Sequence, residues 1–266
     1  MEVETYLARI GYAGPKTPTL AMLRSLHRQH MLAVPFENLD IPLGRRITLD
    51  ISALWAKVVV SKRGGFCYEL NTLFGWLLHA LGYDADVLSA RVWTGTDFGP
   101  DKDHMALLVH AGGQPWLADV GFGDSFLEPL RLVPGTIQED GLKSFRLLED
   151  TSGWTMQVRE RAGDWLPEYR FEVRAHRPES FAAMCDFQQT SPDSSFTQRA
   201  VCSRATEGGR VTVTHERLIV TTGDQRDETP LPDAAAFRDA LAAHHGIDLT
   251  PEDAATIVGR FVRAVD

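Results

Sequence analysis

The first third of the chain is predicted to be helical, because apolar residues recur there at spacings of three and four. Two capping side chains, Thr19 and Asp50, each precede such a segment. The first segment ends before Pro35, since proline disfavours a helical residue before it. Gly82 supplies a stop for a third segment that begins near Phe66. The predicted helices cover residues 20–33, 51–62 and 66–81.

The middle of the chain changes to short runs of strand-forming residues separated by Gly, Asp and Pro. Strands that follow one another without intervening helices favour an antiparallel sheet or barrel. The strand-like runs are residues 85–95, 104–110, 114–122, 145–149, 154–163 and 165–175. After them the pattern predicts a helix at 178–190, a hairpin at 210–222, and helices at 232–246 and 250–265.

These patterns together predict a mixed α+β protein with three regions. Residues 1–84 form a helical region, residues 85–190 an antiparallel β region, and residues 191–266 a mixed region. The chain of 266 residues is long enough for each region to contribute to a buried core.

The charge balance limits the partners of this protein. Lys and Arg total 27 against 36 Asp and Glu, which gives a formal net charge of −9. An acidic chain does not attract nucleic acid or an anionic membrane, so neither is expected as a partner. The N-terminal MEVETYLARIGY lacks the apolar core of a signal peptide, and no stretch reaches the roughly 20 apolar residues that span a bilayer. A cytoplasmic protein is predicted, and its state, monomer or homodimer, is left open.

Cysteine and histidine spacing argues against a disulfide framework and a metal site. The three cysteines are scattered and form no C-x-x-C pair, which fits a reducing compartment and leaves Cys67 available as a free thiol. His215 and the His244-His245 pair lack suitably spaced partners, so no metal is predicted.

Cys67 follows Arg63-Gly64-Gly65-Phe66 and stands in the first turn of the third predicted helix. Only the thiolate of cysteine is a strong nucleophile, and the positive end of a helix dipole lowers the pKa of a thiol. The two glycines permit a tight approach of the chain and of a substrate. The plainer interpretation is a small buried residue at a helix start, since free cysteines are usually buried and inert. The functional interpretation therefore needs a base.

His104 is the strongest candidate base among the nine histidines, because it opens a strand that returns as a hairpin. A four-residue loop at 110–113 would place His104 directly opposite Asp119, and a two-residue Gly112-Gly113 turn would make them diagonal neighbours. Either register puts both side chains on one face of the sheet. A carboxylate beside an imidazole fixes its tautomer and stabilises its protonated form. Cys67, His104 and Asp119 are thus a candidate nucleophile, base and orienting acid.

Each partner also has a plainer interpretation: a solvent-facing strand histidine, and an acid that ends its strand. Asp119 lies between Ala118 and Val120 in an apolar strand, which is an unfavourable place for an unpaired charge. Directly after it, Gly121-Phe122-Gly123 offers backbone N–H groups in a turn that can receive a phosphate or an oxyanion. A Gly-x-Gly sequence is more often only a turn.

The sequences VPFENL, RGGFCYELN, HMALLV and WLADVGFG, in this order, resemble the arylamine N-acetyltransferase family. The resemblance implies an N-terminal helical bundle, a β-barrel-like middle and an α/β lid, with a papain-like Cys-His-Asp arrangement at Cys67, His104 and Asp119. It also implies acetyl transfer from acetyl-CoA to an arylamine, arylhydrazine or arylhydroxylamine by a ping-pong mechanism through an acetyl-cysteine, and a role in xenobiotic metabolism.

The resemblance assigns further residues. Phe36, Tyr68, Val92, Phe122 and Phe196 correspond to acceptor-pocket positions, although without the resemblance Phe36, Val92 and Phe196 would be assigned to ordinary core. The Gly121-Phe122-Gly123 turn becomes a candidate binding site for CoA. Glu37 and Arg63 match a supporting salt bridge, which on the surface would contribute little. Asp103 stands where similar bacterial members often carry Thr, and its carboxylate would repel CoA phosphates.

Three other functions are compatible with these residues. One is a macrolactam-forming amide synthase of the same family, which consumption of acetyl-CoA with isoniazid or an aniline would distinguish. Another is a Cys-His-Asp hydrolase or transglutaminase-like enzyme, which would not form an acetyl-enzyme from acetyl-CoA alone. The last is a non-catalytic binding module, in which Cys67 would label slowly with iodoacetamide.

Overall fold

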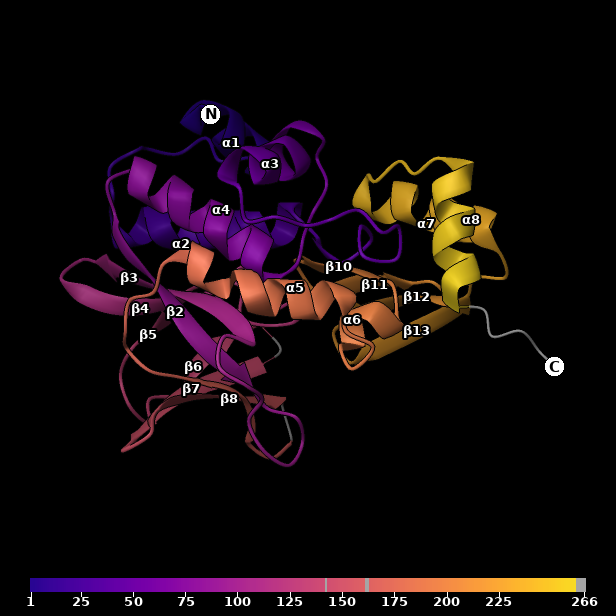
Figure 1. Cartoon of the computed structure of the whole chain (residues 1–266). Coiled ribbons are helices and arrows are strands. Elements are labelled where there is room, and N and C mark those ends of the chain that lie inside the picture. The colour runs from indigo at the N-terminus through magenta and orange to yellow at the C-terminus, as the bar shows by residue number, and fades with distance from the viewer. Residues whose placement is uncertain (142, 161–162, 262–266) are drawn as a thin grey trace.

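The computed structural model describes residues 1–141, 143–160 and 163–261. Figure 1 shows the helices of the first third packed over a curved sheet, with a second sheet and two C-terminal helices beside them. The protein is a mixed α+β protein, which confirms the predicted fold class.

The N-terminal helices are α1 (Val3–Ile10), α2 (Leu20–Ala33), α3 (Ile51–Trp55) and α4 (Cys67–Ala80). Both predicted caps are formed, since Oγ1 of Thr19 accepts a hydrogen bond from the N–H of Met22 and Oδ1 of Asp50 accepts one from Ala53. The second predicted helix is interrupted, because α3 passes into a π-helical turn, η1 (Ala56–Val60). Helix α4 is buried along most of its length and is the centre of this layer.

An eight-stranded antiparallel sheet carries the middle of the chain, in the order β5-β4-β3-β2-β9-β8-β7-β6. Each strand-like run predicted for residues 85–175 overlaps one of its strands. Residues 161 and 162 of the run 154–163 lie outside the described residues. The strands β5 and β6 are additional, because two or three residues are too few to show an alternating pattern. The bounds are β2 (Asp84–Val92), β3 (His104–Ala111), β4 (Gln114–Ala118), β5 (Leu130–Arg131), β6 (Gln138–Asp140), β7 (Lys143–Asp150), β8 (Gly153–Glu160) and β9 (Leu166–Phe171).

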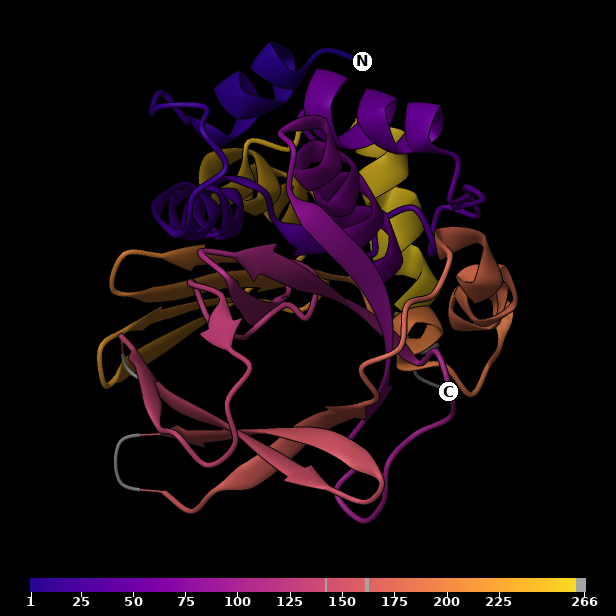
Figure 2. The ribbon, with the colours of Figure 1, turned by 90° about the vertical axis from the view of Figure 1, so that its left-hand side faces the viewer.

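This sheet curls into a nearly closed barrel, which is visible end-on in Figure 2. Its two edge strands are joined through Gln138, whose side chain both accepts from the N–H and donates to the carbonyl of Arg131. Alternate residues of β3 pack into two different hydrophobic cores. Leu107 and Val109 pack against the helices, whereas Leu108 packs inside the barrel. The same alternation directs His104 to the barrel side.

The C-terminal part builds a second, five-stranded antiparallel sheet in the order β1-β10-β11-β12-β13. Its edge strand β1 (Phe36–Glu37) comes from the N-terminal region, and Phe36 pairs with Ser203. Helices α7 (Ala234–His245) and α8 (Pro251–Phe261) pack beside this sheet (Figure 1). The other strands are β10 (Val201–Thr206), β11 (Gly209–Thr214), β12 (Arg217–Thr222) and β13 (Gln225–Pro230).

The helix predicted at 178–190 is divided into a 3₁₀ turn, η2 (Pro178–Phe181), and α5 (Ala182–Thr190), and a short α6 (Ser195–Gln198) follows. Residues 262–265 of the last predicted helix lie outside the described residues. The division into 1–84, 85–190 and 191–266 remains a prediction. Strand β1 belongs to the first of these regions but pairs with β10 in the third. Within the described ranges no helix is both long and apolar enough to cross a membrane.

Candidate active site

Helix α4 presents Cys67 as its first residue. Glycine is needed at two positions around Cys67, one shortly before it in the chain and one in a distant segment that packs against it. A Cβ at Gly64 would lie 1.9 Å from the carbonyl oxygen of Pro35, and a Cβ at Gly121 would lie 2.7 Å from Cα of Cys67. Three segments that are distant in sequence therefore pack backbone against backbone around the thiol-bearing residue.

Cys67 is 4% exposed and lies in an apolar cluster that includes Phe66, Met105 and Phe181. Burial raises the pKa of the Cys67 thiol well above its usual value, although a backbone hydrogen bond from Met105 opposes the rise. The net direction is upward, so burial favours the uncharged thiol. A thiolate at this position requires a cationic partner.

The hairpin of β3 and β4 carries His104, the candidate for that partner. Its turn is the two-residue Gly112-Gly113 form, in which both glycines have positive φ, 61° and 72°. His104 and Asp119 are therefore diagonal neighbours, and Nε2 of His104 lies 2.6 Å from Oδ2 of Asp119. Both side chains are buried, at 3% and 0% exposed. The pair predicted from the hairpin is formed.

The hydrogen bonds of Asp119 fix the tautomer of His104. Burial alone would raise the pKa of Asp119, but the charge and hydrogen bond of His104 and further donors hold it below its usual value. A carboxylate only accepts hydrogen bonds, so Nε2 of His104 carries the ring proton. Nδ1 is then the nitrogen that can take a proton from a thiol, and His104 and Cys67 line the same cavity.

Asn71, which the sequence analysis missed, connects the three elements of this site. Its Nδ2 donates to the carbonyl oxygen of Met105 at 2.6 Å and to Oδ1 of Asp119 at 2.9 Å. Its Oδ1 accepts from the N–H of Val120 at 3.0 Å. Asn71 lies four residues after Cys67 and so on the same face of α4. That spacing was the available signal for a residue joining the helix of Cys67 to both strands of the hairpin.

The Gly121-Phe122-Gly123 turn lies beside Cys67 and lines the cavity. The prediction that its N–H groups are free is wrong for Gly121, whose N–H donates to Oδ1 of Asp119 at 2.9 Å. Gly123 adopts a φ of 99° and packs under the ring of Phe36. The first glycine of the turn therefore supports Asp119, and the remainder shapes the cavity.

His27 on α2 is a second residue that the sequence analysis did not assign to the site. Its Nε2 accepts from the N–H of Asp119 at 3.0 Å, and its Nδ1 donates to the carbonyl oxygen of Leu127 at 2.7 Å. Its ring stacks on Phe126 at 5.5 Å. Burial lowers the pKa of His27 to about 4, so the ring is neutral at pH 7 and can both accept and donate. It fixes the backbone that carries Asp119.

His27→Gln should reduce the sensitivity of the fold to acid. Between about pH 6.5 and 4 the unfolded chain binds a proton on His27 that the folded protein excludes. Stability from this group is therefore complete above about pH 6.5 and is lost as pH falls toward 4, by about 3 kcal/mol. Glutamine can make both hydrogen bonds without titrating.

Urea unfolding at about pH 7 and pH 4.5 measures this effect. The wild type should lose about 2 kcal/mol more than His27→Gln on acidification. His79→Gln, at an exposed position on α4, is the control and should lose as much as the wild type. Equal losses in all three proteins would contradict the prediction.

A cavity of about 1200 Å³ opens beside Cys67 and His104. The ring of Phe122 meets the ring of His104 edge to face at 5.1 Å, and the rings of Phe36 and Phe196 lie 6.0 Å apart. An apolar wall of this kind suits a flat aromatic ligand. Four of the five predicted pocket residues line the cavity: Phe36, Val92, Phe122 and Phe196.

Tyr68, the fifth predicted pocket residue, occupies a different position. It is fully buried and packs against Phe66 and Phe181. Its hydroxyl donates to the carbonyl oxygens of Lys102 and Asp103 at 2.9 and 3.0 Å. The side chain therefore supports the segment that leads into His104, and it does not belong to the described residues that line the cavity.

The cavity extends between the barrel and the second sheet, where two cations meet one carboxylate. Oδ1 of Asp124 lies 3.0 Å from Nζ of Lys143 on β7 and 3.1 Å from Nε of Arg210 on β11. All three residues line the cavity. This end of the cavity combines cationic side chains with backbone of the glycine-rich turn, a combination that suits an anionic group.

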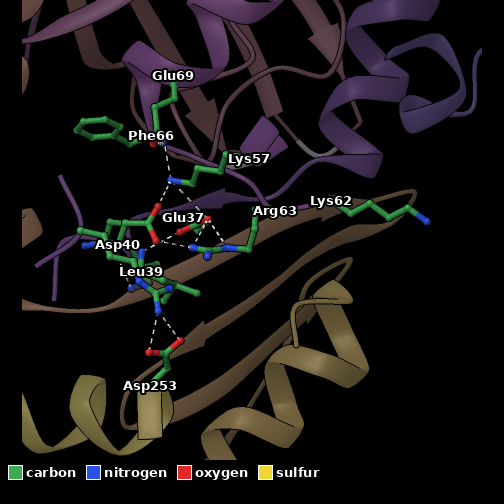
Figure 3. A network of polar contacts seen from close by, with 12 residues as sticks. Glu37, Leu39, Asp40, Lys57, Lys62, Arg63, Phe66, Glu69 and Asp253 are labelled. Atoms are coloured by element: carbon green, nitrogen blue, oxygen red, sulfur yellow. Dashed lines mark hydrogen bonds and ion pairs between the residues drawn. The ribbon is translucent and has the colours of Figure 1, made fainter. Parts of the chain in front are cut away.

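Glu37 and Arg63 belong to a buried charge network (Figure 3), not to a surface pair. Arg63 lies 2.8 Å from Oε1 of Glu37, which is 0% exposed, and it also reaches Asp40. Nζ of Lys57 lies 2.7 Å from Asp40 and 2.8 Å from Glu69. Burial alone would lower the pKa of Lys57, but the surrounding carboxylates raise it above its usual range.

This network reaches the start of α4. Oε2 of Glu69 accepts from the N–H of Phe66 at 3.1 Å, so the residue that lies before Cys67 is anchored to Lys57 through one carboxylate. Burial raises the pKa of Glu69 to about 7, with Lys57 opposing the rise. The network thus joins α4 to the segment that carries Phe36.

Lys57→Ala should destabilise the protein by about 3 to 5 kcal/mol, because it leaves the buried Glu69 without a cation and removes one of the two cations that Asp40 contacts. Lys57 is only 14% exposed. The matched control is Lys16→Ala, since Lys16 pairs with Glu4 where both side chains are half exposed or more. That change should cost less than about 1 kcal/mol. Urea unfolding measures both, and a Lys57→Ala loss as small as the control would contradict the prediction.

In the part of the chain that the structure describes, no three His, Cys, Asp or Glu side chains are grouped so as to hold a metal ion.

The chain is similar in sequence and in fold to known proteins. A family model described as N-acetyltransferase matches residues 19–254. An arylamine N-acetyltransferase from Mycolicibacterium smegmatis is 33% identical, over 99% of this chain and 96% of the relative. Proansamycin X synthase from Amycolatopsis mediterranei is 32% identical over 92% of this chain and 98% of its own. The Mycobacterium marinum arylamine N-acetyltransferase in complex with CoA superposes with a TM-score of 0.89, at 31% identity, covering 97% of this chain and 98% of that structure.

Proposed function

Because the chain belongs to the arylamine N-acetyltransferase family, we propose that it transfers acetyl from acetyl-CoA to an aromatic amine or hydrazine through Cys67. The enzyme is an acyltransferase. The observation that carries the proposal for the residues is that Cys67 and His104 line one cavity, with Nε2 of His104 held by Asp119 at 2.6 Å.

In the first half-reaction, the Cys67 thiol gives its proton to Nδ1 of His104. The resulting imidazolium is stabilised by Asp119, and it is the cationic partner that the buried thiolate requires. The thiolate attacks the thioester carbonyl carbon, and backbone N–H groups near the N-terminus of α4 stabilise the oxyanion. The carbon–sulfur bond to CoA breaks, and the CoA thiolate takes the proton from Nδ1.

In the second half-reaction, the neutral amine attacks the carbonyl carbon of acetyl-Cys67. Nδ1 of His104 takes the amine proton, the Cys67 thiolate leaves, and the acetylated amine departs. An aromatic amine suits this step because it is uncharged at pH 7 and can stack on Phe122 and Phe36. Those rings also limit the access of water that would hydrolyse the acetyl-enzyme.

We propose that CoA binds at the end of the cavity that Lys143 and Arg210 line. Gly121 lies beside Cys67, and Phe122 and Gly123 line the same cavity. Lys143 and Arg210 supply the positive charge that the phosphates of CoA would meet. Asp124, which now pairs with both cations, would have to yield to the phosphates. We place no metal in this mechanism, since each step uses Cys67, His104 and backbone donors.

A macrolactam-forming amide synthase is a second candidate, favoured by the similarity to Proansamycin X synthase along nearly its whole length. It would use the same three residues with a carrier-bound acyl group in place of acetyl-CoA. Release of CoA separates the two candidates.

The experiment is to measure release of CoA from acetyl-CoA with isoniazid and with aniline as acceptors. The proposal predicts turnover with at least one acceptor, parallel double-reciprocal lines when both substrates are varied, and none with Cys67→Ala. Absence of turnover in the wild type would favour the amide synthase. Turnover in Cys67→Ala would refute the role of the thiol.

A further inference from the structure

Asp103 places a carboxylate on the wall of the cavity that holds Cys67 and His104. Several groups fix the position of this carboxylate. Nε2 of Gln188 on α5 donates to its Oδ1 at 2.8 Å, and a backbone hydrogen bond from Val92 reaches the same carboxylate. A Cβ at Gly99 would lie 2.4 Å from Oδ2, so glycine there leaves the space that the carboxylate occupies. The side chain is therefore held in place and is only half-buried.

No lysine or arginine among residues 1–141, 143–160 and 163–261 forms an ion pair with Asp103. Another acid on the cavity wall, Asp124, is in contrast neutralised by Lys143 and Arg210. Burial raises the pKa of Asp103, and His104 only partly opposes the rise. A carboxylate that is partly desolvated and has amide donors but no lysine or arginine gains most from a cation supplied by a ligand.

The reacting amine cannot be that cation. It must be neutral to attack acetyl-Cys67, and a protonated amine has no lone pair to use. A positive group near Asp103 must therefore be a second group on the acceptor, which leaves the reacting nitrogen free. The aromatic wall of Phe122, Phe36 and Phe196 would hold the aromatic ring of the acceptor, which lies between the reacting nitrogen and the positive group.

We propose that Asp103 selects acceptors by charge, so that the enzyme prefers aromatic amines carrying a second, cationic nitrogen and discriminates against aromatic amines that carry a carboxylate. This proposal rests on the proposed function and names the class of acceptor for the same site. Asp103 is a specificity residue here: it binds a substituent and takes no part in the proton transfers at His104.

Three acceptors of nearly the same shape test the proposal: 4-aminobenzamidine, which is cationic, 4-aminobenzamide, which is neutral, and 4-aminobenzoate, which is anionic. The measured quantity is kcat/KM for each acceptor at saturating acetyl-CoA, in the wild type and in Asp103→Asn. The intrinsic reactivity of each amine is the same for both proteins, so it cancels when their selectivity ratios are compared. Asparagine is isosteric and can still accept from Gln188, and a thermal melt checks that the variant is folded.

The ratio of the amidine to the benzoate should fall about 10- to 100-fold in Asp103→Asn, whereas the benzamide should change much less. The charge-matched control is Asp101→Asn, which removes an exposed acid two residues away. It should change the ratio less than about threefold.

An unchanged ratio in Asp103→Asn, with benzamide still acetylated through Cys67, would overturn this proposal and leave the proposed function intact. A rise in the KM for acetyl-CoA without a change in acceptor selectivity would also overturn it, since it would assign the carboxylate to the donor site. Failure of all three acceptors, with isoniazid and aniline also inactive, would overturn both proposals.

Discussion

Asp119→Asn should lower the rate of acetyl transfer about 10⁴-fold while the protein remains folded. An asparagine can still accept from Asn71 and Gly121 through its oxygen. Its Nδ2 would then face His104 and donate to Nε2, which forces the ring proton onto Nδ1. A ring in that tautomer cannot take the proton of the Cys67 thiol. The measurement is CoA release with aniline at saturating acetyl-CoA.

A second Asp–His pair on the same sheet provides the control. Asp84, which is 78% exposed, lies 3.4 Å from Nδ1 of His110 at the other end of β3. Asp84→Asn removes the same charge and should leave the rate within about twofold. An Asp119→Asn variant that keeps more than about a tenth of the wild-type rate would show that the tautomer of His104 does not limit the reaction.

His104→Gln should slow the alkylation of Cys67 by iodoacetamide about 10³-fold near pH 6. The thiol is buried, and burial favours its uncharged form. Only an adjacent imidazolium can keep a useful fraction as thiolate below neutral pH, and glutamine cannot carry a proton. The rate is measured by mass spectrometry on the peptide that contains Cys67, because Cys185 and Cys202 are also free and buried.

His110→Gln is the matched control, since it alters a half-exposed histidine of the same strand. It should label at the wild-type rate. Equal labelling of His104→Gln and the wild type would mean that another group, or the helix N-terminus alone, sets the reactivity of the thiol.

The pairing of His104 with Asp119 could be predicted because it depends only on a local hairpin. The two glycines of the turn fix the register of the hairpin, and the register determines which side chains share a face of the sheet. The helix starts after Thr19 and Asp50 were predictable for the same reason, since a cap acts on its own first turn.

Long-range contacts were not predictable from local pattern. Strand β1 has two residues and pairs with β10 more than 160 residues later, Phe36 with Ser203. The contact of His27 with the N–H of Asp119 spans 92 positions. The sequence around His27 gave no indication of which backbone group its ring would contact. The family resemblance brought together Phe36, Val92, Phe122 and Phe196. Without it, Phe36, Val92 and Phe196 would have been assigned to ordinary core.

The effect of burial on charged and ionisable side chains was also not predictable from the sequence. The sequence indicates that Cys67 begins a helix, but not that apolar side chains bury it and so raise the pKa of its thiol. Likewise Glu37 and Arg63 would contribute little on the surface, whereas their burial with Lys57 makes each partner costly to remove. In both cases the surrounding side chains, which come from distant segments, decide the effect.

Intact-mass spectrometry after brief exposure to acetyl-CoA, with no amine present, tests most directly whether the thiol at position 67 carries the acetyl group. One acetyl group should appear on the wild type, map to the peptide containing Cys67, and disappear when an aromatic amine is added. Cys67→Ala should gain none. A wild type that stays unmodified, or a Cys67→Ala variant that is acetylated to the same extent, would contradict the account.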